Sequence, residues 1–178
     1  YATSTYLHMY FGSSTISILY VIASIITLLA SIHIAKYIKR FHTYQFTLGL
    51  VIAEIITTIA FATTTNPLFI GLFFVTHFCL QVLLYICINI FIETFSNHKE
   101  TGSIRGIFLA LLNMGILISP VLAGAILSIS SFQALYIVAS CILIPFIFFL
   151  HRYMSHIEEP AYHSLDMVKA AKRAWKKS

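Results

Sequence analysis

Five long apolar stretches constrain the fold of this chain more than any other feature of its sequence. An α-helix needs about 20 apolar residues to cross the roughly 30 Å of hydrocarbon in a bilayer. The stretches reach that length at about 13–35, 44–64, 68–93, 104–128 and 132–150. The sequence therefore predicts an all-α, multi-pass membrane protein, with a transmembrane helical bundle at 1–151 and a polar cytoplasmic linker at 152–178.

The composition excludes a water-soluble domain. Of the 178 residues, 59% are hydrophobic and 10% are charged, whereas soluble domains carry about 25% charged residues. So few charges cannot cover a water-exposed surface, and the lipid bilayer is the first expected partner. The net charge of +5 does not indicate a nucleic-acid partner, because the basic residues lie in short loops and in the tail rather than on one soluble face.

The basic residues indicate how the bundle is oriented. All 11 lysines and arginines lie in alternate connections or in the tail, and the segments YATSTYLHMYFG, TTNPL and SISSFQ between them carry no charge. The positive-inside rule places short basic connections in the cytoplasm. We therefore expect a cell-membrane protein with Tyr1 outside and Ser178 in the cytoplasm. Five spans, an external amino end and no initiating methionine also lead us to expect a preceding helix that this sequence lacks.

The tail changes from apolar to polar after residue 151. Its stretch SLDMVKAAKRAWKK is typical of a short basic amphipathic helix, with Ser164 as N-cap and Asp166 in the first turn. The apolar side chains near one face of that helix are Leu165, Val168, Ala171 and Trp175. Such a helix lies well on a cytoplasmic leaflet. A solvated linker that is only partly helical is the alternative.

The stretch GIFLALLNMGILISPVLAG carries small residues at regular spacing. At about 100° per residue, Gly115, Ser119 and Ala123 form one stripe along the helix. The residues on nearly the opposite face are Gly106, Asn113, Pro120 and Gly124. Small residues let neighbouring helix backbones approach closely in a membrane. Two such faces predict two close neighbours, and so a position inside the bundle.

This spacing resembles the fifth-helix motif of the major facilitator superfamily of secondary transporters. The motif consists of glycines and a Gly-Pro pair at fixed intervals. The matching positions here are Gly106, Gly115, Ser119–Pro120 and Ala123–Gly124. Serine and alanine replace two of the glycines, and the spacing is complete.

Two connections extend the resemblance. In ETFSNHKETGSIRG, Glu93 and the Arg105–Gly pair are similar in kind to the loop between helices four and five of that family. In AKYIKRFHTYQ, Arg40 matches the signature of the first cytoplasmic loop, while Lys39 and His42 stand where the signature has an aspartate and a glycine. The resemblance makes Arg40, Glu93 and Arg105 candidates for a cytoplasmic gate.

The resemblance also implies a fold and a function. The chain would cover helices two to six of the amino-terminal half of a larger transporter that works by alternating access. Its partners would then be a small-molecule substrate, with or without a coupling ion, together with the missing first helix and the carboxy-terminal half. No cofactor is expected.

Three polar side chains lie near the middle of their spans. Glu54 lies about ten residues from one end of its span, and His77 and Asn113 about nine, which at 1.5 Å per residue is close to the bilayer midplane. Transporters of this kind place their binding sites at that depth. Glu54 is the only carboxylate in mid-span and a possible protonation site. A hydrogen-bonded structural role is the alternative, because the resemblance places the third helix away from the cavity.

Polar residues recur along the span at 68–93. They follow one another at four-residue steps: His77, Gln81, Tyr85 and Asn89. A polar stripe that faced lipid would be costly, so we expect it to face protein or water. These four residues and Asn113 are therefore candidates to line a substrate cavity, with interhelical hydrogen bonding as the alternative.

Motifs for other classes of site are missing from the sequence. The remaining histidines form no metal-ligand pattern, and neither a nucleophile elbow nor a phosphate-binding loop is present. We therefore expect no metal and no enzymatic activity. Two alternatives to a transporter stay open: an integral-membrane enzyme, and a five-helix membrane scaffold or assembly protein without transport activity.

The orientation generates a prediction. Cysteines introduced at Lys39, Lys99 and Lys172 should react with a membrane-impermeant reagent only from the cytoplasmic side, and a cysteine at Tyr1 only from outside. Labelling of closed vesicles of known sidedness measures this. Reaction at position 99 from outside alone would overturn the orientation.

Overall fold

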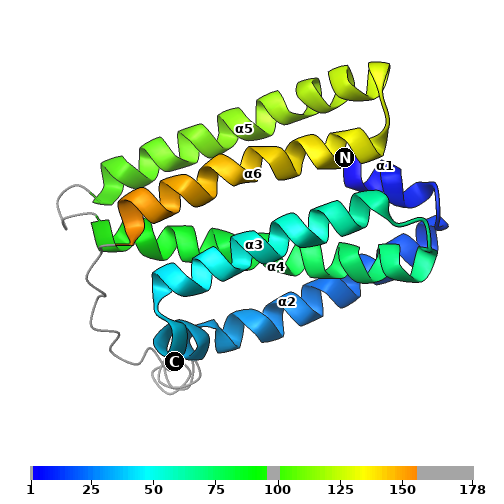
Figure 1. Ribbon diagram of the computed structural model, residues 1–178. Helices are drawn as coiled ribbons and strands as arrows, with labels where there is room; N and C mark the ends of the chain where they lie inside the picture. Colours follow the sequence, from blue (N-terminus) through cyan, green and yellow to red (C-terminus); the bar gives the residue numbers. More distant parts are fainter. Residues whose placement is uncertain (1, 96–100, 156–178) are drawn as a thin grey trace, which may run out of the picture.

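The computed structural model describes residues 2–95 and 101–155, which form six helices and no strand. Along the chain (Figure 1) they are α1 (Ala2–His8), α2 (Ser13–Phe41), α3 (Thr43–Thr63), α4 (Pro67–Phe95), α5 (Thr101–Ile129) and α6 (Phe132–Met154). Helices α2 to α6 are long and apolar enough to cross a membrane. The predicted all-α, multi-pass fold is confirmed, and both α2 and α5 extend beyond the apolar stretches at 13–35 and 104–128.

The two ends of the bundle differ in charge. One end, which we call the basic end, carries Lys36, Lys39, Arg40, Arg105 and Arg152. The opposite end, which we call the uncharged end, holds α1, the α3–α4 turn and the α5–α6 turn (Figure 1). The alternation of charge along the sequence therefore becomes a difference between the two ends of the bundle.

Side chains at the uncharged end start two of the helices. The Asn66 side-chain oxygen accepts a hydrogen bond from the Leu68 N–H at 3.0 Å, and Pro67, which has no N–H to satisfy, takes the first position of α4. Ser131 caps α6 by accepting a hydrogen bond from the Ala134 N–H at 3.4 Å. At both turns the chain reverses direction, and these residues satisfy or remove backbone N–H donors at the starts of α4 and α6.

A single residue joins α2 to α3. His42 lies between Phe41 and Thr43 with φ 64° and ψ 147°. Of the described residues other than glycine, it is the one with positive φ. A side chain in that region strains the backbone, whereas glycine adopts it readily. His42 occupies the position where the resembled loop signature has its glycine, so the backbone conformation of this joint suits glycine although the residue is histidine.

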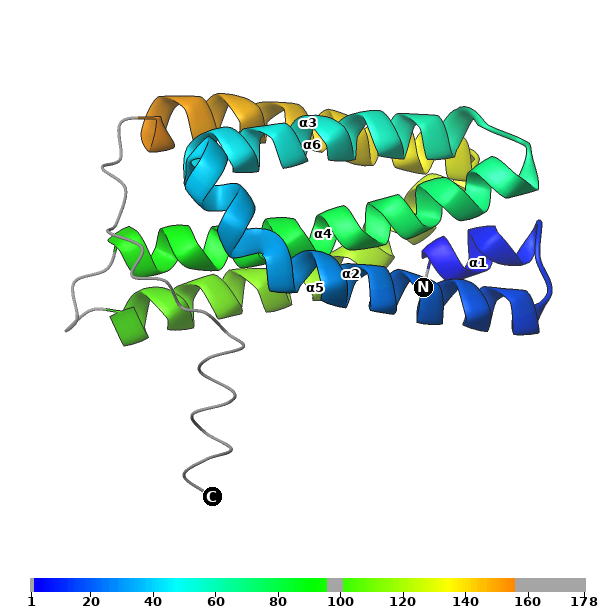
Figure 2. The same cartoon turned by 90° about the horizontal axis from the view of Figure 1, so that it is seen from below.

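The main helix interfaces join α3 with α6, α3 with α4, and α2 with α4. Near the basic end, buried Val51, Phe91 and Leu150 join α3, α4 and α6. At the uncharged end a larger cluster includes Phe61 and Phe74. Viewed from below (Figure 2), α3 and α4 approach one another toward the uncharged end and lie further apart toward the basic end.

Helix α1, for which the sequence analysis made no prediction, packs across the uncharged end. Tyr6 is only 2% exposed, and its ring centroid lies 5.1 Å from that of Phe61 and 5.5 Å from that of Tyr136. The Tyr6 hydroxyl donates a hydrogen bond to the Phe61 carbonyl at 3.4 Å. This short helix therefore ties the ends of α3 and α6 together.

The position expected for α5, inside a bundle between two close neighbours, stays a prediction. This helix lies at the edge of the bundle (Figure 1), and none of the residues in its most apolar 18-residue stretch is buried. A Cβ atom at Gly106, Gly115 or Gly124 would meet no described atom within 4 Å. Small residues allow a neighbouring helix to pack closely, but they provide little side-chain surface for that helix to contact. The two close neighbours are not found among the described residues.

Two predictions lie outside the described residues. They are the amphipathic helix in the tail at 152–178, with Ser164 and Trp175, and the connection that contains Lys99.

The joint at His42 generates a prediction. His42→Gly should be about 1 kcal/mol more stable than His42→Ala, because glycine relieves the positive-φ strain that alanine retains. The matched alanine variant removes the same imidazole, so the difference isolates the backbone. Thermal unfolding of the purified variants in one detergent measures it. Equal stability would show that the joint is unstrained.

Candidate functional site

Glu54 of α3 and His77 of α4 form a buried pair. The Glu54 Oε1 atom lies 2.7 Å from His77 Nδ1, and the two side chains are 4% and 11% exposed. The residues lie at similar distances along the chain from the turn at Asn66–Pro67. Antiparallel packing of α3 on α4 therefore brings them to one level, near the middle of both helices.

A hydrogen bond continues the pair along α4. Gln81 Nε2 lies 3.1 Å from His77 Nε2. An amide N–H only donates, so His77 Nε2 accepts in this arrangement and Nδ1 carries the proton that is donated to Glu54. Thr58 Oγ1, one turn from Glu54 on α3, lies 3.5 Å from His77 Nδ1. The carboxylate, the imidazole and the amide form one chain of hydrogen bonds across two helices.

Aromatic rings close the pair off from the uncharged end. The Phe61 ring stacks on the His77 imidazole with centroids 6.3 Å apart and planes 12° apart, and Phe61 is fully buried. Behind it lie Tyr6 and Tyr136. Burial, with a hydrogen bond to Tyr10, raises the pKa of the Tyr6 hydroxyl, which stays protonated as a donor. Exchange with water through this end requires the ring cluster to move.

The burial of Glu54 gives the pair its chemical importance. An ionised carboxylate without a partner is very costly in a low-dielectric interior, and an opposing imidazolium offsets that cost only with good geometry. Glu54 Oε1 accepts a hydrogen bond from the neutral His77 imidazole, whereas Glu54 Oε2 is buried and makes no hydrogen bond within the described residues. One oxygen of this carboxylate is therefore satisfied and the other is not.

The cavity candidates other than His77 and Gln81 lie apart from the pair. Gln81 and Tyr85 are exposed, and the Tyr85 ring lies 6.2 Å from that of Phe108 on α5. The Asn89 amide donates to the Tyr85 carbonyl at 2.8 Å, within its own helix. Asn113 of α5 is exposed and is not brought to the pair. The structure joins only His77 and Gln81 of this set directly through their side chains.

The gate candidates Arg40, Glu93 and Arg105 are exposed at the basic end. The Arg40 guanidinium carbon lies 5.4 Å from the centre of the neighbouring Phe41 ring.

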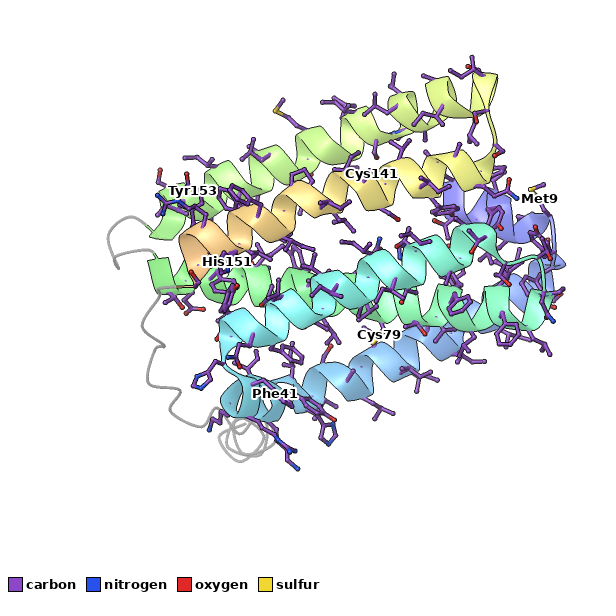
Figure 3. The ribbon with its side chains drawn as sticks, in the orientation of Figure 1. Met9, Phe41, Cys79, Cys141, His151 and Tyr153 are labelled. Atoms are coloured by element: carbon purple, nitrogen blue, oxygen red, sulfur yellow. The ribbon has the colours of Figure 1, made fainter. Side chains whose placement is uncertain are left out.

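A contact that the sequence analysis did not predict lies at the basic end. Figure 3 shows His151 where α6 ends beside the start of α3, and its Nδ1 atom lies 2.8 Å from the Tyr44 hydroxyl.

Comparison with known proteins decides the family. The model of the Major Facilitator Superfamily matches residues 2–177. The chain belongs to this superfamily. Neither curated proteins nor solved structures give a match. The family expected from the resemblance is thereby confirmed, and this major facilitator protein has the transporter character of its family.

The pairing of Glu54 with His77 was not predicted, although both residues were singled out. Their common depth and their position on consecutive antiparallel helices were visible in the sequence. The sequence did not show how each helix is rotated about its axis, and this rotation decides whether two residues at one depth face each other. Thr58 and Tyr44 were missed because threonine and tyrosine occur throughout such spans.

Within the described residues, no group of three or more His, Cys, Asp or Glu side chains could hold a metal ion in this major facilitator protein.

The pair generates a stability prediction. His77→Phe keeps a ring against Phe61 but leaves Glu54 without the imidazole. We expect the free energy of unfolding to fall by about 1–3 kcal/mol, because the buried Glu54 carboxylate loses its hydrogen-bond donor and is left unsatisfied. A double variant, Glu54→Leu with His77→Phe, should recover most of the loss because no charge stays buried. Thermal unfolding measures both. A double variant no more stable than the single one would contradict the pairing.

Proposed function

We propose that this chain is the amino-terminal helical bundle of a secondary active transporter that moves a small solute across the cell membrane by alternating access. The family supports transport, and the polar face of α4 supports the position of the solute site. Two halves of such a transporter rock about a site near the bilayer midplane, and little covalent chemistry is required.

The exposed polar face of α4 carries the proposal. Gln81 and Tyr85 are exposed and Asn89 is half-buried, on a helix long and apolar enough to cross a membrane. Amide and phenol groups are disfavoured against lipid, so this face requires protein or water next to it. We assign it to a water-filled cavity, with His77 at its inner edge and with Asn113 of α5 contributing from a second helix.

The open face of α5 supports the proposed partners. Gly115, Ser119 and Ala123 can accept a closely packed helix, and no described residue covers Gly115. We propose that the first helix and the carboxy-terminal half of the transporter supply the neighbours of α5. We also propose that the basic end faces the cytoplasm. Arg40, Glu93 and Arg105 then lie where an inward gate would open and close.

The cavity assignment generates a prediction for the full-length transporter. Tyr85→Phe and Asn113→Leu each remove polar atoms that make no side-chain hydrogen bond with another described residue, so folding should stay nearly intact. Solute binding should weaken by about 1–3 kcal/mol if one hydrogen bond to the solute is lost. Gln81→Leu is less informative, because Gln81 also hydrogen-bonds His77.

The measurement combines thermal stability with uptake of a panel of labelled solutes into vesicles. Met114→Leu is the matched control. Met114 follows Asn113 in the chain and is also exposed, but its thioether is only a weak hydrogen-bond acceptor. If Tyr85→Phe and Asn113→Leu lose stability while the folded fraction binds solute normally, their polar groups are structural and the cavity lies elsewhere. Absence of uptake for every solute, by the wild type as well, would contradict transport.

A further inference from the structure

We propose that Glu54 and His77 together form one proton-binding site and that the proton is the coupling ion of this transporter. The proposal rests on the transport function proposed above and adds the ion, its binding atoms and its direction of entry. It is carried by the 2.7 Å contact between Glu54 Oε1 and His77 Nδ1, by the contact of His77 Nε2 with Gln81, and by the unsatisfied Glu54 Oε2.

The hydrogen bonds define the state of the pair without the coupling proton. His77 Nε2 accepts from the Gln81 amide, so the imidazole is neutral and its single proton is on Nδ1. That proton is donated to an ionised Glu54 carboxylate. The pair then has a net charge of −1 in the interior of a membrane protein, which is electrostatically unfavourable.

One added proton removes that charge. A proton from water binds His77 Nε2, and the pair becomes imidazolium and carboxylate with no net charge. Movement of the Nδ1 proton onto Glu54 Oε1 then gives an imidazole beside a carboxylic acid, and this is the form that we assign to the protonated site, because it leaves no separated charges in the low-dielectric interior. In either form the site holds one proton more than before, and loss of the proton from Nε2 to water reverses the step.

Gln81 can follow this change without moving along the helix. Rotation of its amide by a half turn replaces the N–H donor by the carbonyl oxygen, which accepts a hydrogen bond from a protonated Nε2. Gln81 is exposed toward the proposed cavity. The orientation of its amide in that cavity therefore depends on the protonation of the pair, which links the proton to solute binding.

The surroundings determine the side from which the proton enters. Phe61, Tyr6 and Tyr136 close the pair toward the uncharged end. Gln81 and Tyr85 lie on the other side, at successive turns of α4 toward the basic end, and both are exposed. In this conformation the proton therefore reaches His77 from water on the side of the basic end, past Gln81.

No other charged group competes for this role at mid-depth in the described residues. The lysines and arginines of the described segments lie near the basic end, and Glu93 lies at the end of α4. The other titratable side chains on the helices packed around the pair are phenols, thiols and three exposed imidazoles. They are Tyr6 and His8 of α1, Tyr20, His33 and Tyr37 of α2, Tyr44 of α3, Cys79, Tyr85 and Cys87 of α4, and Tyr136, Cys141, His151 and Tyr153 of α6; the described part of α5 has none other than Arg105.

Infrared spectroscopy of the purified full-length transporter tests the site with the proton alone as ligand. As the pH falls, the wild type should gain the carbonyl band of a protonated carboxylic acid in a dry environment. Glu54→Gln should lack this band at every pH, and the matched control Glu158→Gln should keep it. A wild-type spectrum without such a band, or a band that persists in Glu54→Gln, would overturn the proposal.

A second variant tests whether the proton is shared. His77→Phe removes the donor that stabilises the ionised carboxylate, so the Glu54 band should appear at higher pH than in the wild type. His33→Phe, at an exposed imidazole on α2 that contacts its own helix, should leave the band unchanged. An unchanged titration in His77→Phe would show that Glu54 binds its proton alone.

Proton flux separates this proposal from the transport proposal. Vesicles that contain a pH-sensitive dye should show proton movement with solute uptake by the wild type, and Glu54→Gln should lose the proton movement while it still exchanges solute. Solute uptake without proton movement by the wild type would overturn proton coupling and leave transport intact. A titrating Glu54 in a protein that takes up no solute would instead contradict transport.

Discussion

A carboxylate in the middle of a membrane helix cannot be hydrated by the bilayer, and the arrangement of α3 and α4 satisfies that constraint. Glu54 is 3% exposed, so its charge must be met by protein. His77 meets it at 2.7 Å, which fixes both the level and the rotation of α4 against α3. The other main interfaces extend from these two helices, with α6 on α3 and α2 on α4.

The spanning helices could be predicted from the sequence, because they depend on the transfer of apolar side chains from water to lipid. A run of about 20 apolar residues has few alternatives to a spanning helix, and all five spans are present. The turns at Asn66–Pro67 and Ser131 could also be placed, because their capping side chains act locally. The similar level of Glu54 and His77 along their helices follows from the rise of a helix and could also be predicted.

Properties that depend on which way a helix faces could not be predicted. Periodicity shows that Gly115 and Ser119 share a face, but it does not show what lies against that face, and no described residue lies against Gly115. Tyr6 presents the same difficulty. The first twelve residues lack a spanning pattern, yet Tyr6 is almost completely buried by rings from α3 and α6. Contacts between residues far apart in sequence decided both outcomes.

Phe61 belongs to two groups of contacts at once. The Phe61 ring stacks on the His77 imidazole. It also contacts the rings of Tyr6 and Tyr136, and this ring cluster holds α1 against α3 and α6. A rotation of α3 that withdrew Glu54 from His77 would also withdraw Phe61 from that cluster. Release of the charged pair and loosening of the seal formed by α1 are therefore mechanically a single event, and one phenyl ring transmits it.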